Sequence, residues 1–189
     1  NGQGLWGTYY GKSYFDITGS VDVDENDNVH AAIVSEKPNP TYPGNYYYFF
    51  QKLVYLKLNS NGNLVFKKEI GQEIGNPAYS GYSDETTIND VKFFNKKLYI
   101  IGETVIDGYG TSGSFQEHLT GVFSGFLSKF DAISGDLDYF TYVGGNAATT
   151  LYEIFNSDAT GIEIMGWTKK KNFPMIDAFQ PIHNISAKG

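Results

Sequence analysis

The stretch LDYFTYVG, residues 137–144, alternates aromatic or apolar residues with other residues and ends on glycine. Two more stretches share this arrangement, LVFKKEIG at 64–71 and GLWGTYYG at 4–11. Each of the three follows a short sequence of turn-forming residues: NGQ (1–3), NGN (61–63) and SGD (134–136). Alternation that follows a turn is typical of a half-buried β-strand. We therefore predict three equivalent strands, each of which opens one copy of an internal repeat.

A second strand recurs within each copy. The stretches VHAAIVS (29–35), LYIIGET (98–104) and IEIMGWT (162–168) are predicted to be buried strands. Eleven residues after the end of each stretch comes an aromatic residue, namely Tyr46, Phe115 and Phe179. Equal spacing in three places indicates an internal repeat rather than chance.

Two further strands bring each unit to four. Closing strands are predicted at 53–59 and 125–131, where the sequence alternates around Lys57 and Lys129. The strands between the opening and the buried ones are predicted at 19–24 and 88–94. The second copy is nine residues longer over this part, and we place the extra residues in a loop at 72–82.

Four short antiparallel strands repeated in series predict an all-β chain made of β-propeller blades. The blade repeats are predicted at about 4–63, 64–136 and 137–189, within a single propeller segment that spans residues 1–189. The first two blades are complete, and the third lacks its last strand. A β-sandwich has similar strand spacing, but its strands are not self-similar at this period.

Propellers usually close with at least four blades, so three blades leave apolar faces uncovered. The chain also begins with Asn1 rather than Met. We therefore expect this segment to be part of a larger propeller. Either the remainder of a longer polypeptide or a protein partner would complete it.

Composition excludes several classes of protein. Hydrophobic residues make up 41% and charged residues 19%, which indicates a folded chain. The net charge is −7 and all 14 basic residues are lysines, so a nucleic-acid-binding face rich in arginine is not expected. The absence of cysteine excludes disulfides and thiolate metal sites. No apolar stretch approaches the roughly 20 residues that cross a bilayer, so membrane insertion is not expected.

Five motifs together resemble one family of repeats: TYVGG (141–145), VDENDN (23–28), NFP (172–174), AFQ (178–180) and FLSKFD (126–131). They are similar to the bacterial β-propeller repeats labelled SBBP. The resemblance extends over nearly the whole chain. It departs at Asp27, where glycine is usual, and in the second copy, which lacks the double glycine and has the shortened turn FNKK (94–97).

This resemblance implies a secreted or surface-attached bacterial protein, often a large one with several domains. A composition rich in Lys, Asn, Ile and Tyr would suit a Gram-negative bacterium of low GC content. The repeat motifs contain no catalytic residues, so the resemblance implies no active site and no cofactor.

The string DVDENDN (22–28) is the strongest metal-like motif. Asp22, Asp24, Asn26 and Asn28 stand at alternate positions, as at the start of a Ca²⁺-binding loop. The sixth position of such a loop needs glycine and the twelfth needs glutamate, whereas Asp27 and Ile33 stand there. We therefore favour a hairpin turn over a calcium site, because Asn and Asp readily adopt positive φ.

No catalytic constellation is apparent. The three histidines, His30, His118 and His183, lie in different repeats, and no two have metal-ligand spacing. His30 falls inside a predicted strand, where we expect it to pack across strands. A Gly-x-Ser-x-Gly nucleophile motif is absent. An enzyme is therefore not expected.

The aromatic cluster NYYYFF (45–50) is the most unusual feature of the sequence. Tyr46 matches the repeated aromatic and is expected to be partly structural. Tyr47 and Phe49 would then face the other way and could contact a protein partner or stack on a sugar. Simple strand alternation, with one face buried between blades, is the favoured alternative.

Two functions follow from these features. The first is a non-catalytic structural or protein-interaction module of an extracellular or cell-surface bacterial protein. The second is a carbohydrate-binding adhesin module that uses the aromatic residues Tyr47 and Phe49.

Overall fold

The computed structural model describes residues 6–11, 16–38, 49–71, 86–121, 123–158, 161–169, 172–176 and 178–179. Of these, residues 17, 18, 38, 49, 50 and 156–158 are described by their backbone alone. The described part of the chain contains β-strands and no helix, and every strand pair is antiparallel. The prediction of an all-β chain is therefore confirmed.

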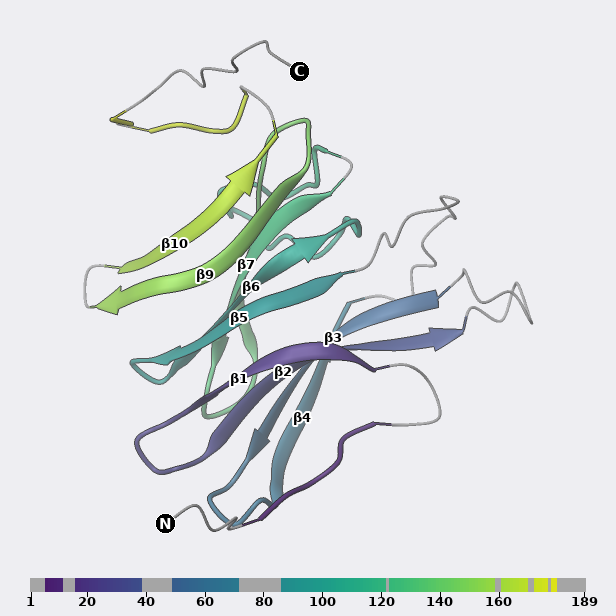
Figure 1. The fold of residues 1–189 in the computed structure, drawn as a ribbon, viewed down its shortest axis with the longest axis vertical. Coiled ribbons are helices and arrows are strands. Elements are labelled where there is room, and N and C mark those ends of the chain that lie inside the picture. The colour runs from purple at the N-terminus through teal and green to yellow at the C-terminus, as the bar shows by residue number, and fades with distance from the viewer. Residues whose placement is uncertain are drawn as a thin grey trace.

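The described strands form three sheets, which Figure 1 shows one above another. The first sheet has the order β1 (Asp16–Val23), β2 (Val29–Pro38), β3 (Phe49–Leu58) and β4 (Leu64–Ile70). The second has the order β5 (Thr87–Phe94), β6 (Lys97–Thr104), β7 (Ser124–Asp131) and β8 (Leu137–Val143). The third consists of β9 (Thr149–Asp158) and β10 (Gly161–Thr168). Strands that follow one another in the chain are neighbours in each sheet, so each sheet is a meander.

The sheets are offset from the sequence repeats by one strand. The sequence places β4 and β8 at the start of the second and third repeats, yet β4 pairs with β3 and β8 pairs with β7. Short hairpin turns explain the difference, since they return the chain directly alongside the strand before the turn. The strand that begins each later repeat therefore closes the sheet of the repeat before it.

The β3–β4 and β7–β8 hairpin turns are each held by a side chain at the end of the strand before the turn. The Asn59 Oδ1 accepts hydrogen bonds from the backbone N–H groups of Asn61 and Asn63, each at 3.0 Å. The Asp131 Oδ1 accepts from the N–H groups of Ile133 and Ser134, each at 2.9 Å. Asn and Asp favour such turns because they satisfy backbone donors locally. The chain thus repeats its turn chemistry as well as its strands.

The turn between β5 and β6 is shorter. It has two residues, Asn95 and Lys96, with φ values of 48° and 60°. Positive φ at both positions is the mark of a type I′ turn, whose twist matches that of the flanking strands. The shortened FNKK turn predicted from the sequence is therefore a tight hairpin.

The opening strand predicted at 4–11 is not observed, because residues 6–11 are described and contain no strand. β4 and β8 each pair with the closing strand of a preceding sheet, and the described residues offer no such strand to residues 6–11. Instead, the Trp6 Nε1 donates a hydrogen bond to the carbonyl of Ser60 at 2.9 Å. The indole lies on Gly62, where a Cβ atom would come within 2.8 Å of the ring. The segment therefore begins against the turn that joins β3 and β4.

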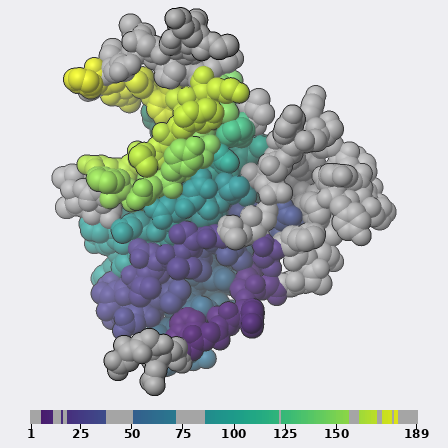
Figure 2. Space-filling model, viewed as in Figure 1, coloured from purple at the N-terminus to yellow at the C-terminus, as the bar shows by residue number. Residues whose placement is uncertain are grey.

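The three sheets pack face to face, and the core lies between them. The first and second sheets share a large cluster that includes Ala32, Val34, Tyr55, Ile100 and Phe130, all fully buried. The second and third share a smaller one, built on Ile101, Leu151 and Ile154. β1 contacts β5, and β5 contacts β9, so the first strands of the three sheets are neighbours. Figure 2 shows the sheets as successive bands across one face of the molecule.

An aspartate on the first strand of a sheet bonds to the first strand of the next. The Asp22 Oδ2 accepts from the N–H of Phe93 at 2.7 Å, so β1 is tied to β5. The Asp90 Oδ2 accepts from the N–H of Ile154 at 2.8 Å, so β5 is tied to β9. In each case the other carboxylate oxygen accepts from the N–H of the following residue. These carboxylates satisfy strand N–H groups at the places where two sheets meet.

We expect the substitution Asp90→Ala to lower the free energy of unfolding by about 1–3 kcal/mol, because the N–H of Ile154 loses its acceptor. Urea unfolding followed by fluorescence measures the change. Lys92→Ala serves as the control, because Lys92 is exposed on the same strand. Equal unfolding midpoints for the two variants would show that the carboxylate does not hold the sheets together.

Candidate functional site

The turn between β1 and β2 is organised by one carboxylate, that of Asp24. Its Oδ1 accepts hydrogen bonds from the backbone N–H groups of Asn26 and Asn28, each at 2.9 Å. The Asn28 side-chain amide donates to both Asp24 oxygens, at 3.0 and 2.8 Å. Asp27 completes the turn with a φ of 59°. This is a closed hairpin turn in which the carboxylate takes the place of missing backbone acceptors.

The four residues of the calcium hypothesis do not converge on one point. Asp22 reaches across to the second sheet, and Asn26 is exposed. Asn28 turns its amide donors, not an oxygen, towards Asp24. Within the described residues, no group of three or more His, Asp or Glu side chains is placed to hold a metal ion. The arrangement supports the turn interpretation that the sequence favoured.

Asp24 also begins a buried chain of hydrogen bonds. The His30 Nε2 lies 3.2 Å from the Asp24 Oδ2, and its Nδ1 lies 2.6 Å from the Tyr55 hydroxyl. An ionised carboxylate can only accept, so a neutral His30 donates from Nε2 and accepts the Tyr55 proton at Nδ1. Each of these polar groups therefore has a partner, although His30 and Tyr55 are both 0% exposed.

The relay formed by Asp24, His30 and Tyr55 lies at the interface between the first and second sheets. The His30 ring stacks on Phe93 of β5, with ring centres 5.0 Å apart. The Tyr55 ring meets Phe130 of β7 edge-on at 5.4 Å. The Lys57 ammonium lies 3.6 Å from Asp24 and donates to the carbonyl of Ala132 at 3.0 Å. His30 thus packs across sheets as well as within its own sheet.

Burial and hydrogen bonding together determine the protonation states of the relay. It lowers the pKa of His30, and the Lys57 charge lowers it further, against the opposing influence of Asp24. Burial and nearby carboxylates raise the pKa of Tyr55 above its usual range. Burial alone would also raise the pKa of Asp24, but hydrogen bonds from Asn28, His30 and Asn26 hold it well below its usual range.

An Asp–His–Tyr chain has the connectivity of a proton relay, yet general acid–base or nucleophilic work requires contact with substrate. The rings here are covered by Phe93 and Phe130 and have no exposed surface. The protonated Tyr55 hydroxyl is a poor nucleophile. The geometry therefore supports a structural role, in which the relay is held together within the first sheet and its rings pack against the second.

We expect acidification from pH 7.5 to 5.5 to destabilise the fold through His30. The unfolded chain protonates this histidine near pH 6.5, whereas the folded protein holds it neutral to lower pH. Between the two pKa values the unfolded state binds more protons, so stability falls with falling pH, by up to about 1.4 kcal/mol per pH unit. Urea unfolding at several pH values measures the slope.

Two histidine variants isolate the cause of this slope. His30→Gln should flatten it, whatever its effect on stability at pH 7.5. His118→Gln should keep the wild-type slope, because the His118 side chain is 76% exposed. An unchanged slope in His30→Gln would rule out the buried histidine as its source.

A second buried polar network lies at the far ends of the same strands. The Gln51 side-chain Nε2 donates to the Glu36 carboxylate at 2.7 Å, and the Gln51 Oε1 accepts from the N–H of Thr86 at 2.8 Å. The Thr86 and Thr104 hydroxyls lie 2.8 Å apart. Glu36, Gln51 and both threonines are buried. This network again joins the first sheet to the second.

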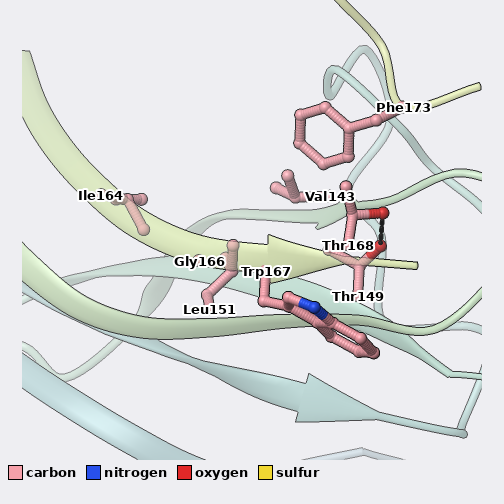
Figure 3. Close-up of a pocket in the computed structure, with 8 residues that line it drawn as sticks. All are labelled: Val143, Thr149, Leu151, Ile164, Gly166, Trp167, Thr168 and Phe173. Atoms are coloured by element: carbon pink, nitrogen blue, oxygen red, sulfur yellow. Dashed lines mark hydrogen bonds between the residues drawn. The ribbon is translucent and has the colours of Figure 1, made fainter. Parts of the chain in front are cut away.

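A hollow of about 290 Å³ opens beside the third sheet. Its lining is mostly apolar: Val143, Thr149, Leu151, Ile164, Gly166, Trp167, Thr168 and Phe173. Figure 3 shows Phe173 beyond Val143, with Thr149 and Thr168 joined by a 3.0 Å hydrogen bond. None of these eight described residues is charged. Its chemistry suits an apolar side chain rather than a polar substrate.

The aromatic residues singled out in the sequence are only partly placed. Tyr47 and Tyr46 lie outside the described residues, and Phe49 begins β3 opposite Pro38 with its backbone alone described. Contact through Tyr47 and Phe49 stays a prediction. Phe115 and Phe179 are exposed, at 54% and 106%, so the repeated aromatic is not a core residue at these two positions.

Sequence reasoning missed two features of this region. Tyr55 stands in a plain alternating strand, and nothing in its neighbours signals a partnership with His30. The hollow depends on residues from β8, β9 and β10 and the segment after them. The available signal was the pair of repeated threonines at the ends of the buried strands, Thr104 and Thr168, which mark equivalent places in the second and third sheets.

Neither a comparison with models of known protein families nor one with curated proteins finds a match for this chain. The described part of the chain also holds no helix with the length and apolarity that a bilayer crossing requires.

Proposed function

We propose that the chain is a non-catalytic structural and protein-interaction module, built of β-propeller blades, in a secreted or cell-surface protein of a bacterium. Its partner is a further sheet of the same kind, supplied by the remainder of a longer polypeptide or by a protein partner. The cellular setting rests on the resemblance of its motifs to bacterial surface repeats.

The outer face of the third sheet carries this proposal. Ala32, Ile101 and Met165 stand three residues before Ser35, Thr104 and Thr168, at equivalent places in the three sheets. Ala32 and Ile101 are 0% exposed, because each faces the next sheet of the stack. Met165 is 52% exposed. A position that two sheets bury against a neighbour is uncovered on the third, which supports a neighbour at this face.

Glu153 adds a polar signal at the same face. It pairs with Met165 in the ladder, just as Asp90 pairs with Ile101. Asp90 ties its sheet to the next by accepting from a strand N–H group. Glu153 thus stands where a carboxylate would accept from the first strand of a further sheet.

The contacts between first strands support blades around a common axis. In a propeller, the first strands of successive blades are innermost and lie close together. β1 contacts β5 and β5 contacts β9, and Figure 1 shows these three strands side by side. The opposite end of the stack also exposes apolar residues, with Val21 at 62% and Val23 at 49% on β1.

A structural role suits the placement of the polar chemistry. The buried groups Asp24, His30 and Tyr55 bond to one another within the first sheet and pack against the second. None of the described residues that line the hollow is an acid or a base. The buried groups stabilise stacking and do not converge on an open cleft.

The proposal predicts self-association between unlike faces. At high concentration, the third sheet of one copy should stack on the first sheet of another, because both faces are apolar and uncovered. Sedimentation velocity over a range of concentrations measures the mass. Met165→Asp and Val21→Asp should each weaken association by roughly tenfold or more, since a charge is placed in the contact.

Mixing the two variants gives a sharper result. Each variant keeps one intact face, so the mixture should form a one-to-one dimer and grow no further. Ile133→Asp is the control, because Ile133 is 69% exposed in the turn between β7 and β8. A wild-type chain that stays monomeric up to about 1 mM, where even weak contacts of roughly 4 kcal/mol are seen, would contradict the proposal.

A further inference from the structure

We propose that the edge of β10 and the apolar hollow beside it form a binding site for an extended β-strand. The strand would pair with β10 and place an aromatic side chain in the hollow, opposite Gly166. This inference rests on the proposed function and names a second contact of that module, distinct from the outer face at Met165.

The second sheet supplies the template for the missing strand. There β6 pairs with β7, and Gly102 stands opposite Phe126. β6 and β10 are equivalent strands, and Gly166 stands two residues before Thr168 just as Gly102 stands two before Thr104. The threonine pairs agree, because Thr86 bonds to Thr104 at 2.8 Å and Thr149 bonds to Thr168 at 3.0 Å.

In the second sheet an aromatic ring covers the glycine. A Cβ atom on Gly102 would lie 3.0 Å from the Phe126 Cε1, so the ring rests on the glycine. Phe126 also stacks on Phe140 of β8, with centres 5.2 Å apart. Phe126 is 1% exposed and belongs to one core cluster with Ile88 and Ile100.

In the third sheet the described residues form the equivalent lining, and none of them supplies a ring in the place of Phe126. Ile164 matches Ile100 by position, and Phe173 matches Tyr109, five residues after the threonine. Ile100 is 0% exposed, whereas Ile164 is only partly buried and Gly166 is exposed. The hollow of about 290 Å³ lies at this place, as Figure 3 shows. An apolar cavity of about 150 Å³ already accommodates benzene, so one aromatic side chain fits.

The backbone at the rim is suited to receive a strand. Among the described strands, β10 pairs with β9 alone, whereas β6 pairs with both β5 and β7. An edge strand presents a row of N–H and C=O groups that can pair with an incoming strand. Main-chain hydrogen bonds then supply affinity, and the pocket for the alternate side chain supplies selectivity.

β7 also predicts the order of residues in the ligand. Opposite Ile100 it places Ser128, and opposite Thr104 it places Ser124. The matching strand on β10 therefore has an aromatic residue opposite Gly166 and small residues opposite Ile164 and Thr168. Residues 123–131 of this chain, FSGFLSKFD, have this order and can serve as a probe.

The test is binding of a fluorescently labelled peptide of residues 123–131 to the full 189-residue chain, followed by anisotropy. We expect saturable binding. A peptide with Phe126→Ala should bind at least about tenfold more weakly, because the hollow stays empty. The protein variant Phe173→Ala, which removes one wall of the hollow, should weaken binding of the unmodified peptide. Ile133→Ala is the matched control and should bind as wild type does.

Backbone N-methylation of the peptide distinguishes strand pairing from non-specific hydrophobic contact. Alternate N–H groups of a strand face its partner, so N-methylation at either Leu127 or Ser128 of the peptide should abolish binding while the other is tolerated. The inference is overturned if both methylated peptides and the Phe126→Ala peptide bind as tightly as the parent peptide. It is also overturned if no peptide binds at about 1 mM, a concentration at which even very weak binding is detected.

Failure here is separable from failure of the proposed function. Self-association through Met165 and Val21 uses other surfaces and is measured without any peptide. Intact self-association with no peptide binding would remove only the strand-binding site.

Discussion

The stacking of one β-sheet on the next is the constraint on which the rest of this structure depends. No described sheet has a core of its own, because the apolar side chains on a face of a single sheet are buried only when another sheet packs against that face. The first and second sheets meet through Tyr55, His30 and Phe93, with ring centres 5.0 to 5.8 Å apart along this row. Asp24 then fixes the histidine from its own turn. A local turn, a strand and a neighbouring sheet are thereby made to depend on one another.

The polar groups between the sheets fix the relative position of neighbouring sheets. Apolar contact alone allows two sheets to slide, since dispersion and burial are not directional. The Asp22 and Asp90 carboxylates each accept from one particular N–H group of the neighbouring sheet. Lys57 reaches one particular carbonyl, that of Ala132. These bonds fix the register of the stack, at the cost of buried groups that must all be satisfied.

Much of the fold could be predicted from the sequence because its determinants are local. Alternation and turn residues placed the strands at 29–35, 98–104, 125–131 and 162–168 within a few residues of β2, β6, β7 and β10. The offset between repeat and sheet was missed, although the turn at 59–63 is a short hairpin that carries it. The relay was also missed, since Tyr55 lies 25 residues from His30 and Phe93 comes from another sheet. Contacts that form only when distant strands pair or sheets stack cannot be predicted from a local sequence pattern.

The two sheet interfaces differ greatly in size, and this has a consequence for how the molecule opens. The first joins more than a dozen buried residues, whereas the second is built on Ile101, Leu151 and Ile154. Local opening takes place first where few apolar contacts must be broken. The β9–β10 hairpin thus has the lowest free energy of local opening, and its amides would lose hydrogen-exchange protection before those of the other two sheets. The third sheet is thus the less stable end of the stack. It bears the Met165 face and the edge of β10, whereas the Val21 face belongs to the more stable first sheet.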